Sequence, residues 1–225
     1  KFGRSLEERY LQIFKGDEIE FPEDDYQGED IKDLAKEYAD LNGDSLVNVS
    51  AEERKKALVD YALPKNIKKM QADMEKYKIF YDKWFFESEL HKSGAVKAVV
   101  DLLTKKGLTY EKEGAVWYKN KEVLTQKLLK EGKSQKYIDN LELKDDVLIR
   151  QNGNPTYFTA DIAYHKNKFD RGFTTLIDVW GADHHGHVMR MKGAMDAIGY
   201  DGDKLNVVLM QLVKLVKDGE LVRMS

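Results

Sequence analysis

A buried strand that ends in a glycine and leads into a helix constrains the fold of this chain more than any other feature. Residues 173–180 form an apolar run rich in β-branched side chains, which is typical of a strand buried in a parallel sheet. Gly181 ends the run, apolar residues then recur at helical spacing over 186–198, and a second apolar run covers 205–210. Strand, loop, helix and strand in this order make a βαβ unit. The sequence therefore predicts an α/β fold with a parallel sheet in the second half of the chain.

The first half has a different pattern, in which helical spacing dominates. Ser50 followed three residues later by Glu53 is a capping box and predicts a helix start. Pro64 is expected to interrupt that helix, because proline lacks the backbone N–H and clashes with the preceding turn. We therefore divide the chain into a mainly helical region, 1–146, and an α/β region, 147–225.

Composition and charge narrow the class of protein. The net charge of −3 gives no global basic field to attract a polyanion, which counts against a segment that holds nucleic acid by itself. The chain has no cysteine, so disulfides, thiolate zinc sites and cysteine nucleophiles are excluded. No apolar run approaches the roughly 20 residues that span a bilayer, and no signal peptide is evident, so we expect a cytoplasmic protein.

Both ends of the sequence indicate an internal piece of a larger protein. The chain opens at Lys1 inside a helical pattern and stops at Ser225 soon after an apolar run. Natural ends are more often polar tails. The alternative is a complete small domain that has been trimmed.

The loop after the first buried strand is the clearest candidate site. It reads Gly181-Ala182-Asp183-His184-His185-Gly186, and in open α/β sheets ligands bind outside the carboxyl ends of the strands. Glycine allows a ligand to approach the backbone, Asp183 can accept hydrogen bonds from sugar hydroxyls, and a helix start offers N–H groups to anionic oxygen. Two other interpretations stay open. Asp183 is also suited to be a plain helix cap, or it could join His184, His185 and His187 around a metal, although histidines so close together on one helix start point in different directions.

Two further motifs suit charged ligands. Tyr157 and Asp161 are four residues apart in a predicted helix over 157–168, so they share a face on which a carboxylate and a phenol suit a guanidinium. Solvated or structural side chains are the alternative. A turn at Asp218-Gly219 is expected to lead into a short strand, and Arg223-Met224-Ser225 follows as either a phosphate-contacting loop or an ordinary terminus.

In their order and spacing these elements resemble the arginyl-tRNA synthetases of bacterial type. Residues 147–225 carry the specific part of the resemblance, whereas 17–146 match only in patches and 121–144 look longer than is usual. The matching segments are Lys1-Phe2-Gly3-Arg4-Ser5-Leu6-Glu7-Glu8-Arg9-Tyr10, Tyr26-Gln27-Gly28, Trp84-Phe85-Phe86-Glu87-Ser88, Tyr157-Phe158-Thr159-Ala160-Asp161-Ile162-Ala163-Tyr164-His165, Lys168-Phe169-Asp170-Arg171-Gly172-Phe173, Ile177-Asp178-Val179-Trp180-Gly181-Ala182-Asp183-His184-His185-Gly186, Leu209-Met210-Gln211 and Arg223-Met224-Ser225.

The resemblance implies a fold and a set of residue roles. The family is a class I synthetase with a Rossmann-like catalytic domain, of which 147–225 would be the second half and 1–146 a mainly helical insertion. Tyr157 and Asp161 would hold the arginine side chain, and His185 would contact the arginine or its carboxyl end. The positions implied for ATP are Gly181, Asp183 and His184 at the ribose and adenylate, Met210 and Gln211 beside the adenine, and Arg223, Met224 and Ser225 at the start of the catalytic signature loop.

The resemblance also implies an activity. ATP, accompanied by Mg²⁺, would activate L-arginine to the adenylate, and the arginyl group would pass to tRNA(Arg), with no structural metal and a monomeric intact enzyme. The His-x-Gly-His signature of such enzymes is absent from this sequence, and the signature loop stops at Ser225 before its basic residues. We therefore expect the isolated chain to be inactive.

Three other functions remain as alternatives. One is a class I nucleotidyl transferase for another amino acid, against which Asp161 argues, because a neutral substrate side chain would leave a carboxylate unpaired. A second is a non-catalytic module that binds arginine or a partner. The third is a DHH-type metal phosphoesterase, which stoichiometric manganese or zinc would support.

Overall fold

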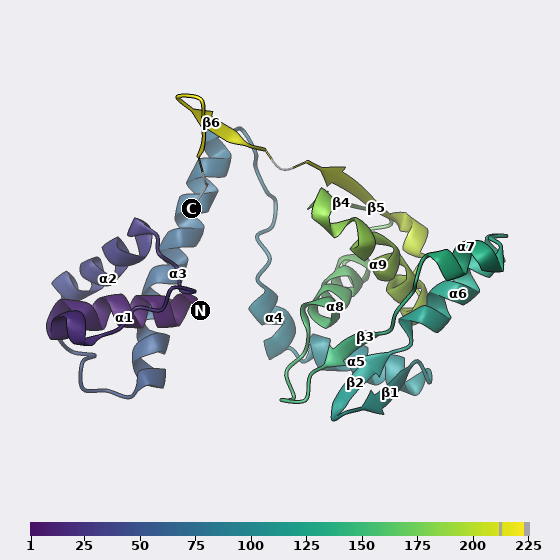
Figure 1. Cartoon of the computed structure of the whole chain (residues 1–225), viewed down its shortest axis with the longest axis horizontal. Helices are drawn as coiled ribbons and strands as arrows, with labels where there is room; N and C mark the ends of the chain where they lie inside the picture. Colours follow the sequence, from purple (N-terminus) through teal and green to yellow (C-terminus); the bar gives the residue numbers. More distant parts are fainter. Residues whose placement is uncertain (212, 223–225) are drawn as a thin grey trace. The chain divides into compact units, whose positions relative to one another are not determined.

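The computed structural model describes residues 1–211 and 213–222, and the described chain divides into two compact units, 1–83 and 84–222. Figure 1 labels their elements along the chain. The first unit is helical and consists of α1 (Phe2–Lys15), the short 3₁₀ helix η1 (Gly16–Glu18), α2 (Glu29–Asn42) and α3 (Ala51–Lys76).

The three α-helices of the first unit bury one apolar stripe each. Leu6 and Tyr10 of α1, Ile31 and Ala35 of α2 and Leu58 of α3 are at most 2% exposed. The predicted capping box forms in part, since the Ser50 hydroxyl accepts a hydrogen bond from the Glu53 N–H at 3.2 Å.

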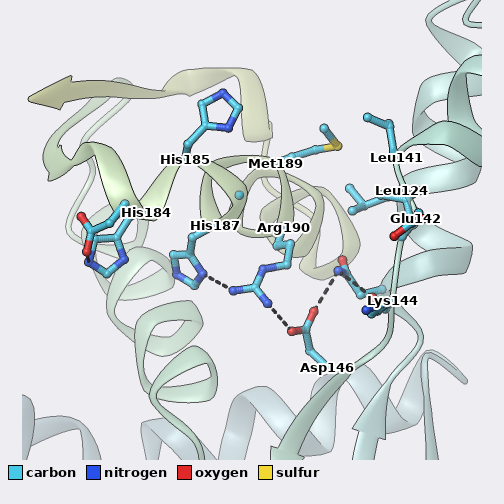
Figure 2. A pocket seen from close by; sticks show the side chains of 14 residues that line it. Leu124, Leu141, Glu142, Lys144, Asp146, His184, His185, His187, Met189 and Arg190 are labelled. Carbon is cyan, nitrogen blue, oxygen red and sulfur yellow. Dashed lines mark hydrogen bonds and ion pairs between the residues drawn. The ribbon is translucent and has the colours of Figure 1, made fainter. Parts of the chain in front are cut away.

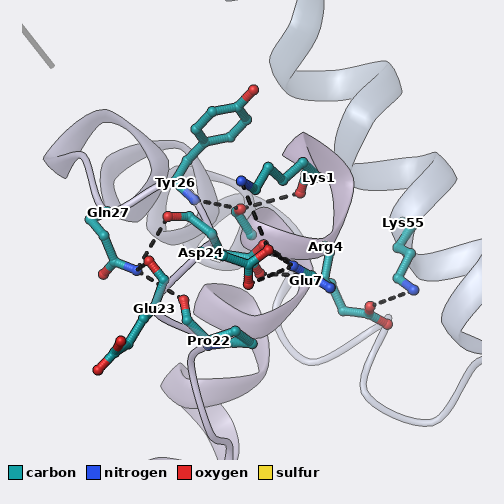
Figure 3. Close-up of polar contacts among 11 residues, drawn as sticks. Lys1, Arg4, Glu7, Pro22, Glu23, Asp24, Tyr26, Gln27 and Lys55 are labelled. Atoms are coloured by element: carbon teal, nitrogen blue, oxygen red, sulfur yellow. Dashed lines mark hydrogen bonds and ion pairs between the residues drawn. The ribbon is translucent and has the colours of Figure 1, made fainter.

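The acidic loop between α1 and α2 is held against α1 by charge (Figure 3). Arg4 Nε donates to both carboxylate oxygens of Asp25, at 3.0 and 2.9 Å, and Arg4 Nη2 donates to Asp24 at 3.2 Å. The Ser5 hydroxyl accepts a hydrogen bond from the Tyr26 N–H at 3.1 Å. Because the Asp25 side chain is fully buried, this pairing supplies the charge that its burial requires.

The prediction that Pro64 interrupts its helix is wrong, because α3 continues through it from Ala51 to Lys76. Proline removes one backbone hydrogen bond, and the bonds on either side are independent of it. Contacts next to the proline also hold the turn in place. Lys65 donates to the Tyr61 hydroxyl at 2.9 Å and pairs with Glu37 of α2.

The second unit contains most of the elements. It comprises α4 (Glu87–Lys92), α5 (Ala95–Lys105), β1 (Thr109–Lys112), β2 (Ala115–Tyr118), α6 (Asn120–Lys130), α7 (Gln135–Asn140), β3 (Asp146–Ile149), α8 (Tyr157–Asp170), β4 (Leu176–Gly181), η2 (Ala182–His184), α9 (His185–Ile198), η3 (Gly202–Lys204), β5 (Leu205–Met210), β6 (Leu215–Lys217) and β7 (Glu220–Val222).

The predicted βαβ unit is present as β4, α9 and β5. The two strands pair in parallel, and their register places Leu176 beside Leu205 and Gly181 beside Met210. Met191 and Met195 of α9 are fully buried in the core of this unit. In this core, α9 packs with α8 and the buried side of the strands.

Two features of the second unit differ from the prediction. The strand at 146–149 pairs antiparallel with β2, so its sheet β1-β2-β3 is antiparallel and only β4-β5 is parallel. In addition, β4 is buried on one face only, since Ile177 and Val179 are 69% and 68% exposed in the structure described. Its apolar run does not reveal this asymmetry, because both faces of the strand carry apolar side chains. The fold is therefore mixed α/β with small sheets.

The boundary between the two compact units lies between residues 83 and 84, whereas the sequence pattern changes between residues 146 and 147. Residues 84–146 join the second unit because β2 pairs with β3, α5 packs on α8, and α6 packs on α9. The division at 146/147 concerns functional regions and stays a prediction. In the described part of the chain, no helix combines the length and the apolarity that crossing a membrane requires.

Candidate functional site

The predicted loop lies at the carboxyl end of the parallel pair, where β4 and β5 finish side by side. Gly181 is the register partner of Met210, and Gln211 follows directly, so three predicted residues meet at one sheet edge. The Asp183 carboxylate folds back over Gly181, where an added Cβ would come within 2.4 Å of Asp183 Oδ1. A side chain at position 181 would therefore displace the Asp183 carboxylate, which is the free end of an exposed side chain.

Asp183 is not the cap of the following helix. The 3₁₀ turn η2 intervenes, and no side chain caps the start of α9 at His185. The Asp183 side chain is 82% exposed and lies 3.7 Å from His184 Nε2. The carboxylate is therefore open to a ligand from solvent.

A cavity of about 610 Å³ opens beside this loop (Figure 2). One wall is the start of α9, and the other is formed by α6, the segment 141–144 and the start of β3. Its lining residues are Asn120, Leu124, Leu141, Glu142, Leu143, Lys144, Asp146, Asp183, His184, His185, Gly186, His187, Met189 and Arg190. Three predicted site residues, Asp183, His184 and His185, thus share one cavity.

The histidines of the loop do not converge. His184, His185 and His187 point in different directions in Figure 2. Within residues 1–211 and 213–222, no group of three or more histidine, aspartate or glutamate side chains is arranged to hold a metal ion.

Tyr157 and Asp161 lie on the first turns of α8, which is fastened to β3. Thr156 caps the helix by accepting from the Thr159 N–H, and its hydroxyl donates to the Val147 carbonyl at 2.7 Å. Tyr157 is 79% exposed, and the Asp161 side chain is 46% exposed. Both side chains are therefore accessible to a ligand. They lie outside the lining of the cavity described above.

A second group of charges holds α8 against β4. Asp178 is 8% exposed and accepts hydrogen bonds from His165 Nε2 and, at 2.7 Å, from Lys168 Nζ. Burial would raise the pKa of Asp178, but the hydrogen bonds from His165 and Lys168 outweigh burial and hold it below its ordinary value. His165 Nδ1 donates to the Asp161 carbonyl at 2.7 Å, so this buried group also fixes the backbone that carries the Asp161 side chain.

A chain of polar contacts that the sequence did not indicate links Asp161 to the cavity. His187 Nε2 lies 3.2 Å from Asp161 Oδ2, and Arg190 Nη2 lies 2.8 Å from His187 Nδ1. Arg190 Nη1 donates to Asp146 Oδ1 at 2.6 Å, and Asn120 Nδ2 donates to Asp146 Oδ2 at 2.8 Å. The available signal was the i, i+3 spacing of His187 and Arg190 on the helix that follows the loop. Sequence reasoning considered His187 only as a metal ligand.

Asp146 is the buried end of this chain of contacts. Burial raises the pKa of its carboxyl above the ordinary value, although the positive charge of Arg190 acts in the opposite direction. The Asp146 side chain is 14% exposed, so its charge depends on Arg190 as a partner. The predicted catalytic residues Arg223, Met224 and Ser225 lie outside the described residues.

Comparison with known proteins identifies relatives over the whole chain. No family model matches it. An arginine–tRNA ligase of Ruminiclostridium cellulolyticum is 52% identical over 227 residues, covering 100% of this chain and 37% of that protein. The arginine–tRNA ligase of Caldanaerobacter subterraneus subsp. tengcongensis is 54% identical over 226 residues with the same coverage.

Solved structures agree with the sequence comparison. A Campylobacter jejuni structure described as an arginyl-tRNA synthetase superimposes with a TM-score of 0.78 at 35% identity, covering 99% of this chain and 44% of that one. Thermus thermophilus arginyl-tRNA synthetase shares the fold, with a TM-score of 0.58 at 16% identity over 93% of this chain and 40% of that one. The resemblance inferred from the motifs is thus confirmed. The chain is related over its entire length to the arginyl-tRNA synthetases, and it spans 37% of the length of the curated relatives that it matches.

Proposed function

We propose that this chain is the part of an arginine–tRNA ligase that binds the arginine side chain and one side of ATP. Residues 147–225 would supply the second half of a Rossmann-like catalytic domain, and 1–146 a mainly helical insertion. The edge at which β4 and β5 end in parallel supports this assignment, since ligands of open α/β sheets bind at such edges.

The observation that carries the proposal is the state of the Asp161 carboxylate. It is half exposed, and in the described structure its side-chain hydrogen bond, to His187, uses Oδ2. The other carboxylate oxygen is open, and the exposed phenol of Tyr157 lies on the same helix face. Such a pair suits a guanidinium, which donates up to five hydrogen bonds. The 52% identity to an arginine–tRNA ligase supports arginine as the source of that guanidinium.

The remaining predicted residues take roles around the same edge. His185 would contact the backbone end of arginine, and Gly181, Asp183 and His184 the ribose and adenylate. Met210 and Gln211 would lie beside the adenine, and Arg223, Met224 and Ser225 would begin the loop at the pyrophosphate.

The proposed reaction proceeds in two steps. The arginine carboxylate attacks the α-phosphorus of ATP, an O–P bond forms, and the bond to pyrophosphate breaks. A ribose hydroxyl of tRNA(Arg) then attacks the arginyl carbonyl and releases AMP. Positioning and charge stabilisation supply most of such catalysis, and Mg²⁺ bound with ATP would neutralise the phosphates. The fragment alone, without the other half of the ATP site, would be inactive.

The test is aminoacylation by the full-length gene product that contains this sequence, with arginine against lysine. We expect arginine alone to be charged. Asp161→Asn should lower kcat/KM for arginine by about 100-fold, because it removes one partner of a charge pair worth roughly 3 kcal/mol. Asp101→Asn is the matched control, since Asp101 is an exposed carboxylate of α5 that pairs with Lys97, and it should leave kcat/KM unchanged.

The outcomes separate the parts of the proposal. Arginine charging that survives Asp161→Asn would keep the enzyme and remove Asp161 from the arginine pocket. A folded full-length protein that charges no amino acid would overturn the proposed function and favour a non-catalytic binding module.

A further inference from the structure

The contacts around His187 define which of its ring nitrogens carries the proton. A guanidinium only donates hydrogen bonds, so His187 Nδ1, at 2.8 Å from Arg190 Nη2, must accept and is unprotonated. The ring proton of neutral His187 is then on Nε2, from which it donates to Asp161 Oδ2 at 3.2 Å. Arg190 thus sets the tautomer of His187, and His187 occupies one oxygen of Asp161.

Packing fixes the orientation of the His187 ring. Its side chain is 13% exposed, and its centroid lies 5.2 Å from that of Trp180 and 5.5 Å, edge to face, from that of Phe158. These contacts hold the plane of the ring, and a half-turn flip within that plane would break its bonds to both Arg190 and Asp161. The open Oδ1 of Asp161 is therefore preset before any ligand arrives.

Arg190 is a potential competitor at this site. Its guanidinium has the same hydrogen-bonding groups as the side chain of the proposed substrate, and it bonds the same His187 ring that bonds Asp161. Asp146 holds this guanidinium at the other end, through Arg190 Nη1 at 2.6 Å, as Figure 2 shows. Asn120 in turn orients Asp146 by donating to its second oxygen.

We propose that Asp146, Arg190 and His187 form a positioning relay, in which His187 presets Asp161 for a substrate guanidinium and Asp146 keeps the Arg190 guanidinium from taking its place. This proposal rests on the proposed function, in which Asp161 binds arginine. Asp146, Arg190 and His187 act through Asp161 and are positioning residues.

The first test is the KM for arginine of the full-length gene product. Asp146→Asn should raise this KM by about tenfold and change kcat by less than about twofold, because a released Arg190 competes with substrate in the ground state. Adding Arg190→Met to Asp146→Asn should return KM to within about threefold of the wild-type value, because the competing guanidinium is gone, and the remaining difference reflects the lost bond to His187 Nδ1. Asp145→Asn is the matched control, since Asp145 bonds Tyr110 and the Lys121 N–H instead, and it should leave KM unchanged.

If the KM of the double variant is as high as that of Asp146→Asn, or higher, Arg190 does not compete with substrate. Asp146 then has only a structural role. An unchanged KM in Asp146→Asn would overturn the competition as well. If the wild-type protein does not charge arginine, the proposed function fails, and the relay is then judged by the second test.

The second test uses the chain itself and needs no activity. Nitrogen-15 spectra of histidine-labelled protein report the protonation of each ring nitrogen. We expect His187 to carry its proton on Nε2 at pH 7, and Arg190→Met to remove the hydrogen-bond signature at Nδ1. A proton on Nδ1 in the wild-type chain would contradict the relay.

Discussion

Glu8 in α1 is an acid whose proton the fold helps to retain at neutral pH. Burial, and after it the neighbouring Asp25, raise the pKa of its carboxyl from the ordinary 4.5 to about 7. Glu8 Oε2 is buried without a hydrogen-bond partner among the described residues. Since the folded state binds this proton more tightly than the unfolded state, the stability from Glu8 is present in full below about pH 4.5 and is lost as pH rises through 7.

Glu8→Gln should therefore stabilise the helical unit at pH 8, because the amide resembles the protonated acid and cannot acquire a charge. The difference from wild type should vanish near pH 4. Hydrogen exchange of the α1 amides at both pH values measures this effect. Glu23→Gln, at an exposed position of the acidic loop that carries Asp25, is the control and should leave exchange of the α1 amides unchanged at both pH values. If Glu8→Gln stabilises the helical unit equally at pH 4 and pH 8, protonation of Glu8 is not the cause of the stabilisation.

At the scale of elements, α3 shows how neighbouring contacts keep a helix intact through a proline. Pro64 lies inside the helix and is exposed. Its missing N–H leaves the Asp60 carbonyl without its partner in the helix ladder. The pairing of Lys65 with Glu37, and the edge-to-face contact of Tyr61 with Tyr38 at 5.1 Å, hold α3 against α2 at this turn.

Pro64→Ala should raise the free energy of unfolding of the helical unit by about 1–3 kcal/mol. It restores one helical hydrogen bond, although it also gives the unfolded chain more freedom, which offsets part of the gain. Urea denaturation followed by circular dichroism measures the change. Lys68→Ala, on an exposed turn of the same helix, should stay within about 0.5 kcal/mol. A loss of stability in Pro64→Ala would mean that proline stabilises the unit more by restricting the unfolded chain than it costs in the helix.

At the scale of the whole molecule, the described chain has two separate hydrophobic cores. One is built from α1, α2 and α3 around Leu6, Tyr10 and Leu58. The other gathers α5, α8, α9 and the strands around Leu148, Met191 and Leu205. The two cores have no residue in common, and each lies in one compact unit. Such units are expected to open separately.

Leu58→Ala should destabilise the helical unit by about 2–5 kcal/mol, because it leaves a cavity at a side chain that is 1% exposed. Hydrogen-exchange protection of α9 should stay unchanged. The reciprocal variant Met195→Ala should lower protection in α9 and leave α1 as it was. Equal loss of protection in both units from either substitution would show that the chain unfolds as one cooperative body.

Local patterns predicted much of the secondary structure. The strand predicted over 205–210 matches β5, the helix predicted over 157–168 extends to Asp170, and the turn at Asp218-Gly219 joins β6 to β7. Asp218 and Gly219 both have positive φ, at 54° and 85°, as a two-residue hairpin turn requires. Periodicity and turn chemistry act within a few residues, so a single sequence contains them.

The sequence also placed a candidate site at the end of β4, because strand ends and glycine loops are local features. Only the tertiary structure decided that β3 pairs with β2, that Ile177 and Val179 are exposed, and that His187 contacts Asp161. The relay joins residues 26 and 44 positions apart in sequence. Which elements pack together depends on the free energy of the whole core. The partners of Asp161 and Arg190 were therefore determined by the arrangement of α8, α9 and β3, and no local window of the sequence contains that information.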